Sequence, residues 1–146
     1  MPSFHQDAKI AALRRSPLFE GLTRKHLVQV ARLTDDLEAP AGTVLCREGS
    51  YGHEFFVIID GEAKATRDGE DLATFHAGDF FGEISLLERT KRTATVTATT
   101  ELRFFVVSQQ AFASLLHADP AIERRVLRTV VRRLVALTGD PTVPFE

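Results

Sequence analysis

The segment FGEISLLERTKRTATVTA, residues 81–98, places a glycine, a carboxylate and a guanidinium at a spacing that could bind an anion. Gly82 tolerates unusual backbone conformations and, without a Cβ, lets a ligand approach the chain. If a short helical turn follows, its first N–H groups have no partners within the helix and form an anion site. Arg92 adds a planar, permanently charged group that suits a phosphate. Thr93 adds a hydroxyl and a further N–H, and an ionised Glu83 requires hydroxyl or amine donors.

These groups together fit a small ligand that carries one negative charge and a neighbouring hydroxyl. A ribose 3′,5′-cyclic monophosphate offers both. The alternative for Glu83 and Arg92 is an internal salt bridge that holds the fold together, and the alternative for Thr93 is an ordinary strand position.

The scaffold for this segment is predicted to run from helices to strands and back to helices. Helical spacing in residues 7–15 and 23–33, with Thr23 as an N-cap, predicts N-terminal helices within residues 1–38. Frequent glycines then separate runs rich in Val, Ile, Thr and Phe, which predicts a β-roll over residues 39–108. The expected strands are residues 43–47, 54–60, 62–67, 71–76, 92–98 and 102–108, and the expected hairpin turns are Asp60-Gly61 and Asp68-Gly69.

The chain returns to helix over residues 109–138. Ser108 can cap the first of these helices, while Asp119 and Pro120 are a cap and a first residue for the second. Apolar residues in the second helix follow the i, i+3, i+4, i+7 pattern with arginines between them, which is typical of a basic amphipathic helix. We expect Gly139 to end it and residues 139–146 to form a tail. The predicted fold class is α+β: one domain over residues 1–146, with a jelly-roll-like antiparallel β-roll of about eight strands between N-terminal helices and a C-terminal helix pair.

The composition is that of an ordinary soluble globular domain. The chain has 146 residues, of which 44% are hydrophobic and 26% charged, with a net charge of -2, so its bulk charge does not indicate nucleic-acid binding. The longest apolar runs, residues 55–59 and 104–107, are far shorter than the roughly 20 residues of a membrane span. No signal peptide is recognisable, so we expect a cytoplasmic protein. Cys46 is the only cysteine, which excludes an internal disulfide, and we expect a half-buried strand residue there.

Residues 81–94 resemble the phosphate-binding cassette of the cyclic nucleotide-binding domain family, found in catabolite activator protein, protein kinase A regulatory subunits and cyclic nucleotide-gated channels. The family pattern is met at Phe81, Gly82, Glu83, Ser85, Leu86, Arg92, Thr93, Ala94 and Val96. Residues 44–61 resemble the family's earlier glycine-rich signature, with one departure at Ser50, where an acidic or amide residue is usual. Residues 16–27 resemble its N-terminal helical entry.

The resemblance implies a regulatory sensor that binds cyclic AMP or cyclic GMP, without a cofactor and without catalytic activity of its own. It implies that Glu83 accepts from the ribose 2′-hydroxyl and that Arg92 pairs with the phosphate. Ala94 would stay small where the backbone approaches the ligand. The phosphate cradle would be completed by backbone N–H groups near Ile84, Ser85 and Thr93. Threonine in this last position is associated in the family with better acceptance of cyclic GMP, but cyclic AMP is our first choice.

The resemblance also implies that the C-terminal helix closes over the purine and that its movement carries the signal. Thr129, Arg132 and Arg133 are the candidates for contacting the base. The helix could instead simply dock on the barrel with its arginines in solvent, or its Val and Leu stripe could pair with a twin in a homodimer. Only 27 residues follow Asp119, too few for the family's winged helix-turn-helix domain, so we expect no direct reading of DNA. The effector protein is not predicted.

Two other functions fit the predicted β-roll. A cupin-type metal-dependent enzyme shares the jelly roll but needs clustered ligands, whereas the five histidines at positions 5, 26, 53, 76 and 117 are scattered. It would require His53 and His76 to converge in space, and a haem role through His76 is a variant of this idea. A degenerate barrel that binds only a protein partner is the third possibility, against which Glu83 and Arg92 argue.

Overall fold

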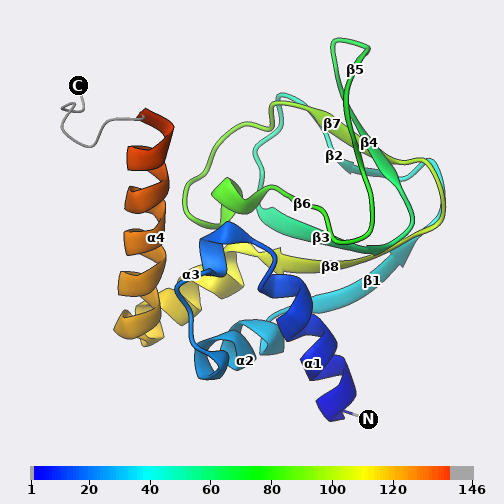
Figure 1. Cartoon of the computed structure of the whole chain (residues 1–146). Helices are drawn as coiled ribbons and strands as arrows, with labels where there is room; N and C mark the ends of the chain where they lie inside the picture. The colour runs from blue at the N-terminus through cyan, green and yellow to red at the C-terminus, as the bar shows by residue number, and fades with distance from the viewer. Residues whose placement is uncertain (1, 139–146) are drawn as a thin grey trace.

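Two four-stranded antiparallel sheets form a β-roll, and the helices gather at one end of it (Figure 1). This computed structural model describes residues 2–138, without the side chains of residues 2–5, 133, 134 and 136–138. The helix end expected at Gly139 and the tail over residues 139–146 lie outside the described residues. The eight strands in two sheets confirm the predicted fold class.

The helices begin where capping side chains predict. Thr23 accepts from the backbone N–H of His26, and Ser108 accepts from that of Ala111. Asp119 accepts from the N–H groups of the second and third residues after it, with Pro120 as the first residue of the last helix. The helices are α1 (Pro2–Leu13), η1 (Pro17–Phe19), α2 (Arg24–Arg32), η2 (Glu83–Leu86), α3 (Gln109–Ala118) and α4 (Pro120–Thr138), where η denotes a 3-10 helix.

One sheet has the strand order β1-β8-β3-β6 and the other the order β2-β7-β4-β5. The strands are β1 (Asp35–Ala39), β2 (Val44–Cys46), β3 (Glu54–Asp60), β4 (Ala63–Arg67), β5 (Glu70–Phe75), β6 (Phe80–Phe81), β7 (Thr95–Ala98) and β8 (Leu102–Ser108). The boundary expected between residues 38 and 39 is wrong, because β1 begins at Asp35 and pairs with β8. Four of its five residues are exposed, so no apolar alternation marks it in the sequence.

The strand predicted over residues 92–98 begins only at Thr95. Arg92 instead bonds to the loop after β2, donating its N–H to the Ser50 carbonyl at 2.7 Å and accepting from the Gly49 N–H at 2.9 Å. Residues 92–94 therefore form a loop that leads into β7 and are not part of the strand itself.

The two Asp-Gly turns have different roles. Asp68 and Gly69 have φ values of 52° and 80° and join the paired strands β4 and β5, which confirms a hairpin. Asp60-Gly61 is not a hairpin turn, because β3 and β4 belong to different sheets. Gly61, at a φ of 100°, instead packs so closely on the Glu101 carbonyl that a Cβ would overlap it. The sequence of a turn dipeptide does not specify which strands pair beyond it.

Strand β3 separates two hydrophobic cores. Phe55 and Val57 point into the core shared with the helices, whereas Phe56 and Ile58 point into the interior of the roll. Both faces of the strand are therefore buried, which explains its unbroken apolar run. On the helical side, the Phe19 ring packs edge-on against Phe55 and against Phe112, each at a centroid distance of 5.7 Å. These contacts fix η1 beside the sheet.

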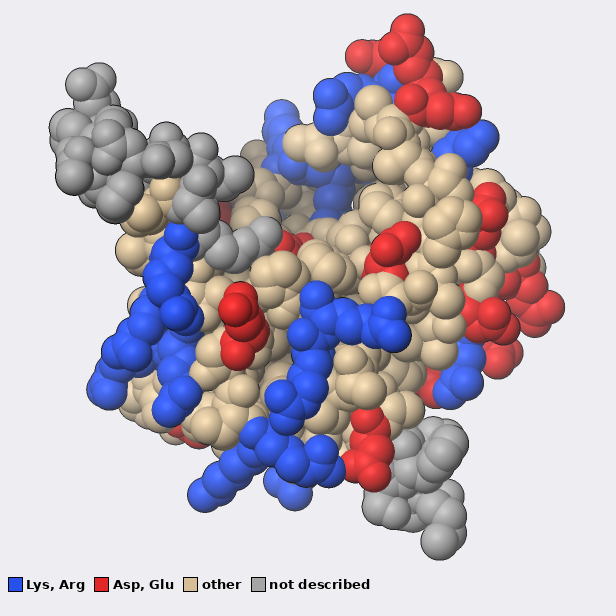
Figure 2. All heavy atoms as spheres, viewed as in Figure 1, with Lys and Arg blue, Asp and Glu red and all other residues tan. Residues whose placement is uncertain are grey.

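Charge is divided between the helices and the roll. Residues 1–34 and 109–138 contain eleven Lys and Arg against four Asp and Glu, whereas residues 35–108 contain seven against fourteen. Figure 2 shows Lys and Arg side chains gathered over the helical end of the molecule. Within the described part of the chain, no helix is both long and apolar enough to cross a membrane. An anion bound in the roll must therefore rely on local cations, because the net charge there is negative.

Candidate functional site

Gly82 makes the turn from β6 into η2 and requires the absence of a side chain. Its φ of 81° lies in the left-handed region, which side chains disfavour. A Cβ there would also overlap the Arg92 guanidinium and lie 2.6 Å from the carbonyl oxygen of Glu54. The chain can thus turn against the arginine only because this residue is glycine.

Arg92 is held in place by main-chain groups. Its Nη2 donates to the Glu54 carbonyl oxygen at 2.6 Å, and its guanidinium lies 5.9 Å from the centre of the Phe56 ring. A Cβ on the buried Gly52 would lie 2.5 Å from Arg92 Nε and also 2.5 Å from Ser85 Oγ. Arg92 Nε is buried and has no hydrogen-bond partner among the described residues. A buried donor without a partner is costly, so this nitrogen is well suited to receive an acceptor from a ligand.

Glu83, the first residue of η2, is bonded to the N-terminal part of the chain. Its Oε2 accepts from the Oγ of Ser16 at 2.9 Å, across 67 residues of sequence. The ion pairs found between described side chains do not include one between Glu83 and Arg92. The alternative of an internal salt bridge between these two residues is therefore wrong in this conformation.

One pocket of about 510 Å³ brings together seven of the predicted ligand residues: Gly82, Glu83, Ile84, Ser85, Arg92, Thr93 and Ala94. We call it the cassette pocket. Its other walls are mainly apolar and include Phe75 and Phe81, whose rings stack at a centroid distance of 5.1 Å. A polar end beside an apolar wall matches a ligand that consists of a sugar phosphate and a flat ring.

The main-chain donors of the pocket are only partly as expected. The Ser85 N–H donates to the Gly82 carbonyl at 3.0 Å, so the turn of η2 uses it internally. The Thr93 carbonyl accepts from Arg67 Nε at 2.8 Å, which brings a second arginine to this loop. Lys91 also lines the pocket. Several cations therefore surround the cassette pocket inside an otherwise acidic roll.

Cys46 also lines the cassette pocket, which the sequence did not predict. It is half-buried in β2, as expected. Burial raises the pKa of the Cys46 thiol, and the nearby Arg92 charge only partly opposes this. The thiol is therefore a neutral part of the wall at pH 7.

The three residues proposed to contact the base lie on α4, and no described α4 residue lines the cassette pocket. Thr129 is buried, donates to the Arg125 carbonyl at 3.0 Å and packs against Gly21. Arg132 is exposed to solvent, and the side chain of Arg133 is outside the described residues. In this conformation α4 packs mainly on η1 and α3 and stands away from the roll (Figure 1).

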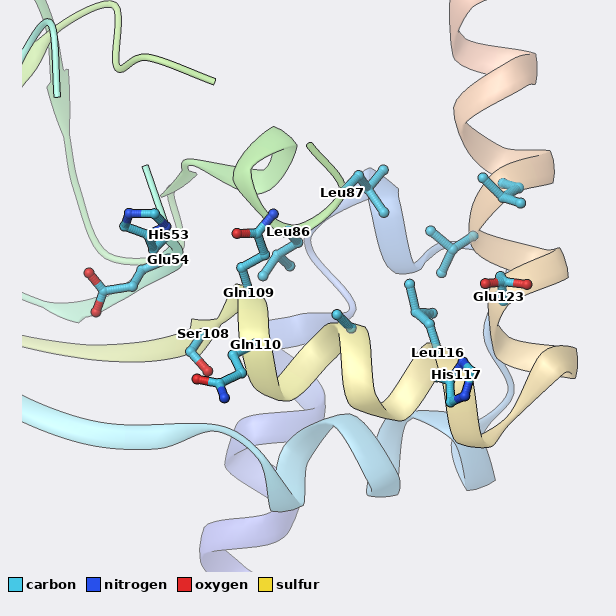
Figure 3. Close-up of a pocket in the computed structure, with 13 residues that line it drawn as sticks. His53, Glu54, Leu86, Leu87, Ser108, Gln109, Gln110, Leu116, His117 and Glu123 are labelled. Atoms are coloured by element: carbon cyan, nitrogen blue, oxygen red, sulfur yellow. The ribbon is translucent and has the colours of Figure 1, made fainter. Parts of the chain in front are cut away.

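A second pocket of about 780 Å³ separates η2 from α4. We call it the helix groove. Leu86 and Leu87 line it on the side of η2, and Val126 and Leu127 line it on α4. Figure 3 shows Leu87 projecting between η2 and α4, with Leu116 of α3 below.

The two histidines proposed for a metal or haem site have different surroundings. His53 lines the helix groove, whereas His76 approaches Glu62 at 3.8 Å. No group of three or more His, Cys, Asp or Glu that could hold a metal ion occurs among the residues that the structure describes.

Residues 36–119 match the family model described as "Cyclic nucleotide-binding domain". The chain belongs to this family. It is 32% identical over 117 residues to a cyclic nucleotide-gated potassium channel of Rhizobium etli, a match that covers 80% of this chain and 33% of the channel. It is 35% identical over 115 residues to the cAMP-dependent protein kinase regulatory subunit of Neurospora crassa, covering 77% of this chain and 30% of that subunit. This cyclic nucleotide-binding chain thus spans about a third of the curated relatives that it matches.

The fold is also similar to solved structures. The crystal structure of the N-terminal domain of a transcriptional regulator from Streptomyces coelicolor superposes with a TM-score of 0.78 at 30% identity, covering 92% of this chain and 97% of that domain. A putative cyclic nucleotide-binding protein of Ruegeria pomeroyi has a TM-score of 0.75 at 23% identity and supports the fold alone.

Proposed function

We propose that this chain is a non-catalytic sensor that binds cyclic AMP in the cassette pocket. The observation that carries the proposal is the convergence of Gly82, Glu83, Arg92 and Ala94 on one pocket in a member of the cyclic nucleotide-binding family. Arg92 pairs with the phosphate and satisfies its buried Nε there. Glu83 accepts from the ribose 2′-hydroxyl, and the stacked Phe75 and Phe81 rings face the purine.

The nucleotide preference follows from residues at the mouth of the pocket. Thr93 is exposed and lines the pocket, so its hydroxyl can reach a ligand. The resemblance associates this threonine with acceptance of cyclic GMP, which we expect as the weaker ligand. The regulatory subunits named above are cAMP-dependent by their descriptions, which supports cyclic AMP as the first choice.

Ligand binding is proposed to move α4 toward η2. The helix groove provides the space, and it has leucines on both sides that would meet when it closes. Leu127 is 53% exposed at present, so closure would bury apolar surface. Arg132 and Arg133 would then come near the base, whereas Thr129 would first have to leave its buried contact with Gly21.

A homodimer through α4 is the second part of the proposal. Leu127 and Val131 are both more than half exposed and lie four residues apart on one side of the helix. Sedimentation with and without nucleotide would show whether this apolar stripe pairs with a second copy or with the groove.

A thermal-shift screen with cyclic AMP, cyclic GMP and their open 5′-monophosphates tests the ligand. Binding at 100 times the dissociation constant stabilises the folded state by about 2.7 kcal/mol, so a cyclic ligand should raise the melting temperature by several degrees. The open monophosphates, with a second phosphate charge and a different shape, should not. No shift with either cyclic nucleotide at millimolar concentration would overturn the proposal.

A further inference from the structure

Ser16 contacts a residue of the cassette pocket although it belongs to the N-terminal part of the chain. Ser16 is fully buried, at 0% exposure. Its Oγ accepts from the Leu18 N–H at 3.3 Å, as the N-cap of η1, and donates to Glu83 Oε2 at 2.9 Å. One hydroxyl therefore uses its acceptor on η1 and its donor on the first residue of η2.

The position of Ser16 is fixed by more than its own hydrogen bonds. Leu18 and Phe19, which follow it in η1, are buried in the helical core, and the Phe19 ring packs on Phe55 of β3. A buried hydroxyl does not exchange its bond with bulk water, and the loss of its acceptor would leave a donor without a partner. The Ser16 side chain is consequently a rigid anchor for whatever it contacts.

Glu83 lines the cassette pocket while it is bonded to Ser16. A carboxylate has two oxygens and about four acceptor positions, so one oxygen can bond to Ser16 while the other bonds to a ligand. We propose that Ser16 is a positioning residue that orients Glu83 to accept the ribose 2′-hydroxyl of the nucleotide. This inference rests on the proposed cyclic nucleotide site and adds to it a residue from outside the cassette.

The proposal predicts an effect that depends on the ribose hydroxyl. Without Ser16, Glu83 Oε2 loses the bond from a buried hydroxyl that helps to orient the carboxylate, and the bond from the carboxylate to the 2′-hydroxyl becomes weaker. Ser16→Ala should weaken cyclic AMP binding by about threefold to tenfold, in the range of one lost hydrogen bond. It should leave the affinity for 2′-deoxy cyclic AMP unchanged, because that ligand makes no bond to Glu83.

Calorimetric titration of both ligands into the full chain measures this difference. Ser16→Thr, which keeps the hydroxyl, should restore the preference for the ribose form. Thr23→Ala is the matched control, because it removes an N-cap from α2 without touching Glu83 and should change neither affinity. If Ser16→Ala does not fold, Ser16→Cys, with a similar size and a weaker donor, takes its place.

Each outcome bears on a different statement. Equal weakening of both ligands would show that Ser16 supports the fold only, and tighter binding of cyclic AMP alone would show that it competes with the ribose; either result overturns the inference but leaves the cyclic nucleotide site intact. Failure of the unaltered chain to bind either ligand would instead overturn the proposed function itself, and this inference with it.

Discussion

Arg92 is positioned before a ligand arrives. Its Nη2 is bonded to the Glu54 carbonyl, its backbone is bonded to residues 49 and 50, and glycines at positions 52 and 82 leave room for the guanidinium. A cation fixed in this way loses little entropy when it binds a phosphate, which favours affinity. The spacing of this residue from Gly82 is a local property, so the sequence could predict that the two residues lie together.

Arg92→Ala is expected to reduce the affinity for cyclic AMP by about 2–5 kcal/mol, because the bound phosphate would lose its charged partner. Calorimetric titration measures the change. Arg89→Ala is the matched control, since that arginine stacks on Tyr51 and does not line the cassette pocket. Equal affinities of the Arg92→Ala variant and the unaltered chain would remove the phosphate assignment.

Other residues of the site could not be read from the sequence. Ser16 reaches Glu83 across 67 positions, and Cys46 and Phe75 join the pocket through strand pairing and sheet packing. None of these residues has a spacing that links it to the cassette. Only the fold brings them to the same place.

At the scale of elements, the predictable strands are those that are buried on both faces or in which apolar and polar residues alternate. Strands β3 and β8 were predicted because their runs of Phe and Val serve two cores at once. Strand β1 is mostly exposed and β6 has only two residues, so neither carries an apolar pattern. Caps are local signals, which is why Thr23, Ser108 and Asp119 marked their helices correctly.

Asp119 joins α3 to α4 and caps the helix that is proposed to move. A hydrogen bond from Gln29 at 3.2 Å is the main reason why the pKa of Asp119 lies below its usual range, with further help from the N–H groups of Ile122 and Ala121. A carboxyl whose pKa is lowered by folding stabilises the folded state at pH values above its pKa in the unfolded chain, about 3.9. This contribution is lost as the pH falls through the lower pKa of the folded state.

Asp119→Asn should therefore reduce the acid sensitivity of the fold. Asparagine keeps the capping geometry but does not titrate, so the melting temperature of the variant should fall less than that of the unaltered chain between pH 5 and pH 3, roughly the range in which carboxyls titrate. Glu70→Gln, at an exposed carboxylate of the β4–β5 hairpin, serves as the control. Parallel pH profiles for the unaltered chain and the Asp119→Asn variant would contradict this role.

At the scale of the whole molecule, the segment around η1 links the roll to α4. Helix α4 rests on η1 and the residues after it, where Arg125 Nη1 donates to the Gly21 carbonyl at 2.9 Å. The N-cap of η1, Ser16, is bonded to Glu83. A change at Glu83 can therefore reach α4 through the N-terminal segment as well as through the helix groove. The sequence predicted the roll and α4 but could not predict their separation, because that depends on contacts between distant segments.

Leu127→Trp provides a reporter for the position of α4, because the chain has no tryptophan. Closure of the helix groove over this position should shift its emission to shorter wavelength when cyclic AMP is added, since the indole would leave water. The same substitution combined with Arg92→Ala should show no shift at that nucleotide concentration. Binding by calorimetry with unchanged emission would mean that α4 stays where it is.

The cassette pocket is open while α4 stands apart, because no described residue of that helix lines it. A nucleotide can therefore enter by diffusion first, and the helix can follow. The rate of the fluorescence change in the Leu127→Trp variant should then rise with nucleotide concentration and level off at the speed of the helix itself. Recognition of the nucleotide and the conformational response would then be two kinetically separate steps.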